Sequence, residues 1–159
     1  MTETEAVRFY RAVGPYGFLS NLHRCRVELD GVEFSSAEHA YQYGKPKTPP
    51  VREWIRAAPL PRHAALAGHH LSTYDVVEGW SGPTDAPWKG AKVERMERVV
   101  EAKFRQNADL AAKLLATGRT QLIEESPDGF WGEGRWANGH NMLGHILMGV
   151  RDKLRAEEP

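Results

Sequence analysis

An acid, an amide and an amine lie along one side of a short predicted helix. Glu38, Gln42 and Lys45 are separated by four and then three residues, the spacing that places side chains on one face of an α-helix. A carboxylate can pass a proton to a departing group. An amine can hold a phosphate or, when desolvated, attack an aldehyde and form a Schiff base. This face is therefore the first candidate for a catalytic site.

The same three residues also have ordinary interpretations. Ser35 lies three residues before Glu38, which is the spacing of a capping box at a helix start. Lys45 precedes Pro46, so it ends the helix, where a cation is favoured by the negative end of the helix dipole. Seven residues of helix span about 10 Å, so Glu38 and Lys45 are expected to contact different parts of one ligand.

Two further acids lie near a glycine-rich segment that carries tryptophan and runs over residues 126–141. Glu124 stands at the end of a short apolar run, and Asp128 follows Ser-Pro and precedes Gly. Each carboxylate can serve an N-glycosidic cleavage, which needs both a proton donor and stabilisation of a developing oxocarbenium ion. The ordinary alternatives are an ion-pair partner for Glu124 and a turn residue for Asp128.

Aromatic and amide side chains supply candidates for substrate binding. Trp131 and Trp88 can stack on a base or ribose, although large aromatic residues also anchor cores and loops. Asn21 and Asn141 can bond to ribose hydroxyls, and their alternatives are an Asx turn and a helix cap, respectively. Seven histidines form no metal-ligand spacing with each other or with the single cysteine, and no nucleotide-binding glycine motif occurs. We therefore predict no metal and no cofactor.

These residues must be positioned by a mixture of short strands and helices. The Asp30-Gly31 pair predicts a two-residue hairpin turn directly before the Glu38 helix. Patterns of apolar and turn residues predict strands over 6–10, 25–29, 32–34 and 120–124, and helices over 35–45, 51–58, 62–67, 88–104, 108–117 and 142–155. A long loop is expected over 69–87. The sequence thus predicts a mainly helical α+β fold with a small β-hairpin or sheet.

Composition fits one domain over residues 1–159, with its core at about 6–155. The chain is 41% hydrophobic, and 21 basic residues balance 21 acidic ones, so its charge gives no broad attraction to nucleic acid or to an anionic membrane. Cys25 is the single cysteine. The sequence shows no apolar signal segment and no long apolar run. Together with the single cysteine, this predicts a cytoplasmic protein.

Ordered motifs along most of the chain resemble the NADAR family, also called the YbiA-like or riboflavin-intermediate N-glycosidase family. The matching residues are Phe9-Tyr10, Gly17-Phe18-Leu19-Ser20-Asn21, Ser36-Ala37-Glu38-His39-Ala40-Tyr41-Gln42 with Lys45, Trp88, Ala102-Lys103-Phe104, Leu114-Leu115-Ala116-Thr117-Gly118, Leu122-Ile123-Glu124, Asp128-Gly129-Phe130-Trp131-Gly132 and Gly139-His140-Asn141-Met142-Leu143-Gly144. One departure is Pro46, where similar proteins usually continue the helix.

The resemblance implies a compact α+β domain that uses water to cleave the N-glycosidic bond between a ribose and a base-like nitrogen. It implies a ribosylamino-pyrimidine intermediate of riboflavin synthesis as substrate, or ADP-ribosylated guanine, including guanine in nucleic acid. No membrane and no obligatory protein partner are expected. The implied catalytic residues are Glu38, Lys45 and Asp128. Substrate-binding roles are implied for Ser20, Asn21, Gln42, Trp88, Glu124, Trp131 and Asn141.

The Glu38 helix is thus expected to form one wall of a ribose-sized pocket and the 128–141 loop the opposite wall. Two rival functions stay open at this point. One is a module that binds ADP-ribose or a nucleotide without cleaving it, and the other is an antitoxin-like protein that acts through protein contact.

Overall fold

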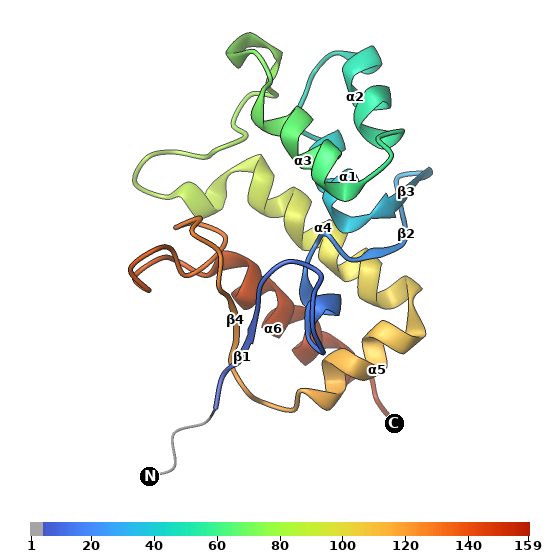
Figure 1. Ribbon diagram of the computed structural model, residues 1–159, viewed down its shortest axis with the longest axis vertical. Coiled ribbons are helices and arrows are strands. Elements are labelled where there is room, and N and C mark those ends of the chain that lie inside the picture. The colour runs from blue at the N-terminus through green and yellow to red at the C-terminus, as the bar shows by residue number, and fades with distance from the viewer. Residues whose placement is uncertain (1–4) are drawn as a thin grey trace. The chain divides into compact units, whose positions relative to one another are not determined.

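The computed structural model describes residues 5–159 and confirms the α+β class predicted from sequence (Figure 1). Its elements fall into two groups of mutually contacting residues. One group comprises residues 24–106, and the described part of the other comprises residues 5–23 and 107–159. Each group is described separately below, and the expectation of a single domain stays a prediction.

Residues 24–106 begin with the predicted hairpin. Strand β2 (Arg24–Leu29) pairs antiparallel with β3 (Val32–Ser36). The two turn residues have positive φ angles, 51° at Asp30 and 79° at Gly31, which is the geometry that an Asp-Gly hairpin turn provides. Val27 and Phe34 face each other across the pair and are both buried. The hairpin therefore has one apolar side on which helices pack.

Four helices complete this group: α1 (Ala37–Tyr43), α2 (Pro49–Arg56), α3 (Pro61–His69) and α4 (Ala91–Gln106). Helix α1 continues from β3 without a loop and packs against α2, α3 and α4. The apolar stripe of α4 is buried, since Val93, Met96, Val100 and Phe104 are at most 4% exposed. Two 3₁₀ turns, η2 (Thr73–Asp75) and η3 (Pro87–Lys89), interrupt the otherwise irregular segment between α3 and α4.

The start of α1 corrects the predicted capping box. Ser36, not Ser35, is the N-cap residue, and its Oγ accepts a hydrogen bond from the backbone N–H of His39 at 3.1 Å. Ser35 still belongs to β3, because its neighbour Ser36 remains paired with Arg24 in the hairpin. The shift by one residue releases Glu38 from a capping role, so its carboxylate is available for other contacts.

The second group contains a short parallel strand pair and two helices. Strand β1 (Val7–Phe9) pairs with β4 (Leu122–Glu124), and α5 (Ala108–Ala116) and α6 (Met142–Ala156) follow their predicted positions within two residues. The 3₁₀ turn η1 (Gly17–Leu19) is buried within this group. Helix α6 packs on both β4 and α5. Sequence pattern predicted both strands but not their parallel pairing.

Candidate functional site

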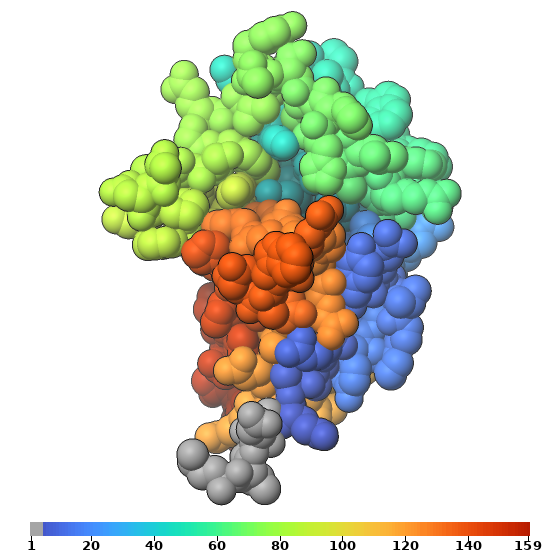
Figure 2. Space-filling model, turned by 60° about the vertical axis from the view of Figure 1, so that its left-hand side comes forward, coloured from blue at the N-terminus to red at the C-terminus, as the bar shows by residue number. Residues whose placement is uncertain are grey.

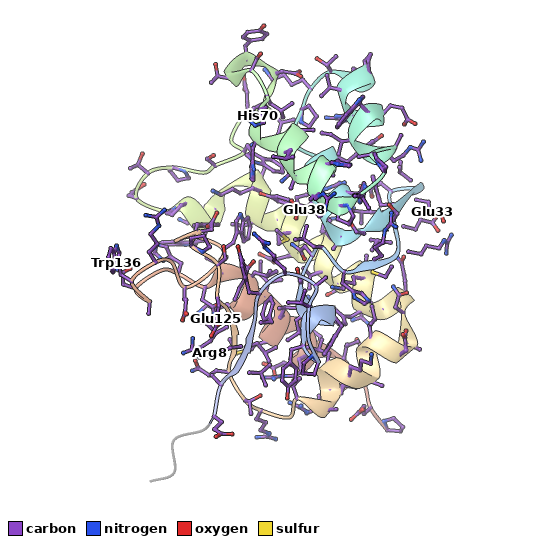
Figure 3. The ribbon with its side chains drawn as sticks, viewed as in Figure 1. Arg8, Glu33, Glu38, His70, Glu125 and Trp136 are labelled. Atoms are coloured by element: carbon purple, nitrogen blue, oxygen red, sulfur yellow. The ribbon has the colours of Figure 1, made fainter. Side chains whose placement is uncertain are left out.

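The predicted polar face of α1 exists, and its acid and amide are hydrogen-bonded to each other. Gln42 Nε2 donates to Glu38 Oε1 at 2.9 Å. Gln42 is buried, Glu38 is half-buried, and burial raises the pKa of the Glu38 carboxyl above its ordinary value, an effect that the Gln42 hydrogen bond partly offsets. A carboxyl group with a raised pKa can hold a proton closer to neutral pH, which suits a proton donor. Figure 3 labels Glu38 on this helix.

Lys45 lies just beyond α1, and its side chain points toward helix α3, which packs against α1. Its Nζ donates a hydrogen bond to the carbonyl oxygen of Gly68 at 2.8 Å. Burial and the nearby charge of Lys92 both lower the pKa of the Lys45 ammonium group. A partly desolvated amine beside a second cation is more readily deprotonated, and the neutral form is the nucleophile. Pro46 follows directly, yet it leaves this side chain on the Glu38 side of α1.

Gly68 of α3 is a site residue that sequence reasoning missed. A Cβ atom built on Gly68 would lie 1.8 Å from Gln42 Oε1, so only glycine allows the Gln42 amide to lie against α3. Among the described residues, Gln42 Oε1 is buried with no hydrogen-bond partner. An unpaired buried acceptor is costly, and a ligand that donates to it would remove that cost. The sequence pattern predicts a helix that ends at residue 67, whereas α3 continues through Gly68 to His69.

Replacing Gly68 by alanine is expected to destabilise the fold by about 1 kcal/mol or more and to displace the Gln42 amide from Glu38. Gly149 is the matched control, because it also lies inside a helix but has open space around its missing Cβ. Gly149→Ala should stabilise the protein by about 0.5–1 kcal/mol. Urea denaturation measures both changes. Equal stabilisation by the two substitutions would contradict the tight contact between Gly68 and Gln42.

The raised pKa of Glu38 also predicts a pH-dependent stability. The folded protein keeps the Glu38 proton over a range above 4.5, its ordinary pKa, in which the unfolded chain has already lost it. The unfolded chain then binds fewer protons, so the free energy of unfolding falls as pH rises through this range. Glu38→Gln removes this penalty. The variant should be more stable than the wild type near pH 7, with an advantage that shrinks as pH falls toward about 4.5 and is lost below it.

Urea denaturation between about pH 4 and pH 8 checks this expectation. Glu97→Gln is the control, since Glu97 is an exposed acid of α4 and its replacement should leave the pH profile unchanged. A Glu38→Gln variant whose stability advantage does not grow with pH would show that Glu38 is not protonated preferentially in the folded state.

His39, which sits between the candidate residues in sequence, has a structural role. Its side chain is fully buried. One ring nitrogen lies 2.6 Å from Ser36 Oγ and the other 2.9 Å from the carbonyl oxygen of Ala58. Burial lowers the pKa of this imidazole. The ring therefore fastens α1 to the segment between α2 and α3.

Trp88 belongs to the same group of residues as Glu38. It lies in η3, one turn before α4, and is 50% exposed. The loop before α4 is closed by backbone hydrogen bonds from Ala91 N to Gly79 O at 2.8 Å and from Lys92 N to Trp80 O at 2.9 Å. Half of the indole is thus free to meet a ligand, which fits the stacking role that the sequence predicted. The prediction had placed Trp88 at the start of the helix itself.

The glycine-rich loop over residues 126–141 is folded rather than extended. Its backbone is cross-linked by hydrogen bonds, including His140 N to Gly129 O at 2.9 Å and Asn141 N to Gly132 O at 2.9 Å. Figure 2 shows the orange atoms of this region gathered into one compact knob. Arg8 of β1 forms ion pairs with Glu133 of the loop at 2.9 Å and with Glu125, just before the loop, at 3.4 Å. Figure 3 labels Arg8 and Glu125. These contacts fix the loop within its own group of residues.

Asp128 has the turn role that was its ordinary interpretation. Its Oδ1 accepts hydrogen bonds from the backbone N–H groups of Phe130 and Trp131, each at 2.8 Å. The side chain is exposed, and Oδ2 accepts no hydrogen bond from the described residues. One carboxylate oxygen thus shapes the loop and the other faces away from that bond. Trp131 is half-buried, with its ring edge-on to Phe130 at 4.8 Å.

Asn141 connects the loop to β4. Its Nδ2 donates to Leu122 O at 2.9 Å and its Oδ1 accepts from Glu124 N at 3.0 Å. Asn141 occupies the N-cap position of α6 with a left-handed φ of 47°, but its side chain makes no cap bond. Asn141 therefore holds the cap position of its ordinary interpretation without making the side-chain cap bond, because both ends of its amide are bonded to β4. Gly144 permits this contact, since a Cβ there would lie 2.1 Å from Leu122 O.

Ser20 and Asn21 are buried beside η1, at 5% and 7% exposure. Ser20 Oγ accepts a hydrogen bond from Leu22 N at 3.1 Å. The predicted site residues thus form two sets within the described structure. Glu38, Gln42, Lys45 and Trp88 lie in residues 24–106, whereas Ser20, Asn21, Glu124, Asp128, Trp131 and Asn141 lie in the other group. That the two sets share one pocket stays a prediction.

Over residues 5–159, no three histidine, cysteine or acidic side chains gather as a metal site would require. Within the same range, no helix has the length and apolar character needed to cross a membrane. The arrangement around α1 instead offers proton transfer by Glu38, an amide acceptor at Gln42 and an amine at Lys45.

Comparison with known proteins relates this geometry to a family. The model of the NADAR domain matches residues 8–155. N-glycosidase YbiA of Escherichia coli is 33% identical over 96% of this chain and 90% of its own length. N-glycosidase Npun_R5314 of Nostoc punctiforme is 34% identical over 94% of this chain and 92% of its own. The riboflavin biosynthesis protein VVA0006 of Vibrio vulnificus is 36% identical over 98% of this chain, which spans 40% of that protein.

A solved structure is similar over nearly the whole chain. The NMR structure of E. coli YbiA superposes with a TM-score of 0.83 at 32% sequence identity, covering 99% of this chain and 89% of that one. The likeness therefore extends to the fold as well as to the sequence.

Proposed function

Because the chain belongs to the NADAR family, we propose that it is an N-glycosyl hydrolase in which the α1 face around Glu38 carries out the proton transfer. Hydrolysis of an N-glycosyl compound is the activity for which the E. coli and Nostoc relatives are named. The observation that carries the assignment of the site is a half-buried carboxyl with a raised pKa, hydrogen-bonded to a buried amide whose oxygen lacks a partner among the described residues.

In the proposed reaction, water adds to the anomeric carbon of the sugar as the carbon–nitrogen bond breaks. The Glu38 carboxyl gives its proton to the departing nitrogen, and the carboxylate that remains stabilises positive charge on the sugar. The carboxylate then accepts a proton from the attacking water, which restores the acid. Gln42 Oε1 is free to accept a hydrogen bond from the same substrate, and Trp88 offers a half-exposed ring on which a base or ribose can stack.

Lys45 is proposed to act on the same sugar in one of two ways. As an ammonium it would hold a phosphate. As a neutral amine it would add to C1 of the ring-opened ribose and displace the base nitrogen, which leaves with the proton of Glu38. Water would then hydrolyse the resulting Schiff base, which frees the sugar and restores the amine. Burial and the nearby charge of Lys92 lower the pKa of the Lys45 ammonium group, which makes the amine form more accessible. Asp128, Trp131 and the other predicted residues of the second group are proposed to contribute a second carboxylate and further contacts to the substrate.

Two substrate classes fit the family. One is a phosphoribosylamino-pyrimidine of the riboflavin pathway, which accords with the name of the Vibrio relative, and the other is guanine that carries ADP-ribose. Incubating the purified protein with both classes, and quantifying free base and free sugar by chromatography, tests the proposal. Release of base from either class supports it and identifies the leaving group. Quantitative recovery of both substrates would overturn it.

A further inference from the structure

A pocket lies within residues 24–106, on the side of α1 opposite to Glu38. It encloses about 450 Å³, and its wall includes Tyr43 and Gly44 of α1, Trp80, and three arginines. Tyr43 is five residues from Glu38, which turns the two side chains about 140° apart on a helix. This pocket is therefore separate from the polar face described above.

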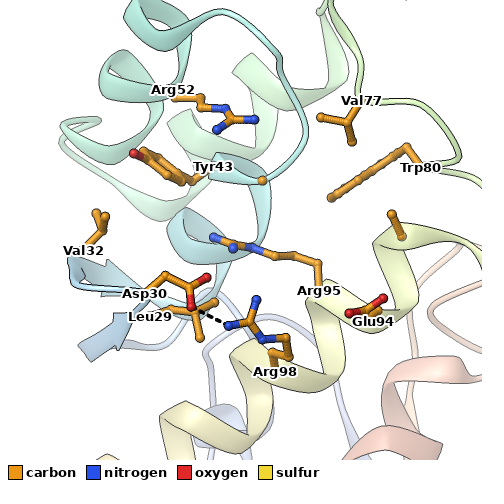
Figure 4. Close-up of a pocket in the computed structure, with 12 residues that line it drawn as sticks. Leu29, Asp30, Val32, Tyr43, Arg52, Val77, Trp80, Glu94, Arg95 and Arg98 are labelled. Atoms are coloured by element: carbon orange, nitrogen blue, oxygen red, sulfur yellow. Dashed lines mark hydrogen bonds and ion pairs between the residues drawn. The ribbon is translucent and has the colours of Figure 1, made fainter.

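The three arginines bring guanidinium groups into one space from two helices. Arg95 and Arg98 extend from α4, and Arg52 extends from α2 toward the same opening (Figure 4). Arg95 donates from Nε and Nη2 to the carbonyl oxygen of Ala40, at 2.9 and 2.5 Å. Arg52 Nε donates to Pro46 O at 2.6 Å. The carbonyl oxygens of Ala40 in α1 and of Pro46 just after α1 thus hold the guanidinium groups of Arg95 and Arg52 in place.

Each guanidinium keeps N–H groups that no described residue accepts. Arg52 has both Nη atoms, Arg95 has Nη1, and Arg98 has Nε and Nη1 without a hydrogen-bond acceptor among residues 5–159. The acids that line the pocket are only two, Asp30 and Glu94. Asp30 bonds to Arg98 Nη2 at 2.6 Å. The lining therefore carries more positive than negative charge and has spare donors.

The electrostatic cost of this cluster is visible at Arg95. Burial, together with the charges of Arg98 and Arg52, lowers the pKa of Arg95 to about 10, and Asp30 offsets only part of that effect. Like charges held together in a partly buried site are stabilised by a bound anion. A guanidinium donates two parallel hydrogen bonds to the oxygens of a phosphate, which makes arginine the usual residue for such sites.

We propose that this pocket, lined by Arg52, Arg95 and Arg98, binds the phosphate group of a small phosphate ester. The phosphate would take the spare N–H groups. The pocket is larger than a phosphate alone requires, and its remaining wall is formed by the apolar or aromatic side chains of Tyr43, Trp80 and Val77. That wall suits the organic part of an ester. The proposal is independent of the hydrolysis assigned to Glu38.

Calorimetric titration of the full protein with ribose 5-phosphate and with inorganic phosphate, at constant ionic strength set by chloride, tests the proposal. Both probes should bind saturably, and amide NMR signals of Tyr43 and Gly44 should shift. Tighter binding of ribose 5-phosphate would identify the ester as the ligand, whereas equal binding would show that the phosphate group alone accounts for the affinity. Either result supports an anion site here.

Two substitutions should act in opposite directions. Arg98→Gln removes a donor and a charge and should weaken phosphate binding by about tenfold. Asp30→Asn removes the competing carboxylate and should tighten binding about two- to fivefold. Asparagine is well suited to the left-handed φ of 51° in this turn, so the fold should persist. Arg95 is left unchanged because it holds Ala40.

Arg26→Gln and Lys45→Gln are the controls. Arg26 is an exposed arginine of β2 outside the pocket, and its loss should not change the affinity. Lys45→Gln removes any phosphate contact on the Glu38 side, so the binding that persists in this variant, and that Arg98→Gln weakens, is binding at the arginine-lined pocket. No saturable binding beyond that of chloride, or binding lost in Lys45→Gln and unaffected by Arg98→Gln and Asp30→Asn, would overturn the proposal.

Discussion

Replacing Glu38 by glutamine is expected to lower kcat for N-glycoside hydrolysis by about 10²- to 10⁴-fold, with the fold intact. Glutamine matches glutamate in size, and its side-chain oxygen can still accept the hydrogen bond that Gln42 Nε2 gives to Glu38 Oε1 at 2.9 Å. What the variant loses is the ability to carry a proton. Substrate affinity should change much less than turnover, because the contacts that hold the sugar are retained.

The comparison needs a matched acid and a stability measurement. Glu97→Gln removes one exposed carboxylate from α4 and should keep full activity. Glu38→Gln should lose activity while its thermal midpoint near pH 7 is equal to or above that of the wild type, as its raised pKa predicts. A Glu38→Gln enzyme that turns over within about threefold of the wild-type rate would exclude Glu38 as the proton donor.

Replacing Lys45 by alanine is expected to lower turnover by about 10²-fold or more, with a loss of stability of only about 0.5–1.5 kcal/mol. The small cost in stability follows from its single described hydrogen bond, from Nζ to Gly68 O at 2.8 Å. Steady-state kinetics and urea denaturation measure the two effects. Lys47→Ala is the control, since Lys47 is exposed two residues away.

Borohydride reduction then distinguishes the two proposed roles of Lys45. A substrate-derived adduct on Lys45, detected by mass spectrometry of the digested protein, would establish a Schiff base. Turnover loss without an adduct, together with a raised KM for phosphorylated substrates only, would establish a phosphate contact. A loss of unfolding free energy large enough to account for the loss of turnover would show that Lys45 is structural.

Local signals in the sequence predicted most of the fold. The Asp30-Gly31 turn and the flanking alternation located the hairpin, and the apolar stripe from Val93 to Phe104 located α4, because both depend on short-range geometry. The N-cap at Ser36 instead of Ser35 was not predictable, because both serines suit a helix cap. The choice is made by the pairing of Ser36 with Arg24, which keeps Ser35 within β3. The parallel pairing of β1 with β4 depends on contacts across more than a hundred residues.

The candidate site was predictable to the same degree. Helical spacing placed Glu38 and Gln42 on one face, and the structure joins them by a hydrogen bond. Gly68 and Lys92 could not be found in this way. Their effects arise only when α3 and α4 fold back against α1, and neither residue has a local pattern that marks it. For Asn141, the sequence left a helix cap open as the ordinary alternative, and the residue does hold the cap position, but the backbone of β4 takes both ends of its amide.

The binding-module and antitoxin-like alternatives remain separate hypotheses. A module would be stabilised by ADP-ribose or a nucleotide and return it whole, and its Glu38→Gln variant would bind equally well. An antitoxin-like protein would form a stable complex in cell extract. Hydrolysis needs the proton donor that we propose at Glu38, whereas neither alternative needs one.

A mass balance of the reaction tests the central claim most directly. The purified protein is incubated with the better substrate of the two classes, and the intact ligand, the free base and the free sugar are quantified together over time. If the protein hydrolyses its ligand through Glu38, base and sugar should appear in equal amounts as the ligand disappears, and Glu38→Gln should abolish this release while still binding the ligand. Full recovery of intact ligand from a protein that it measurably stabilises would contradict the account.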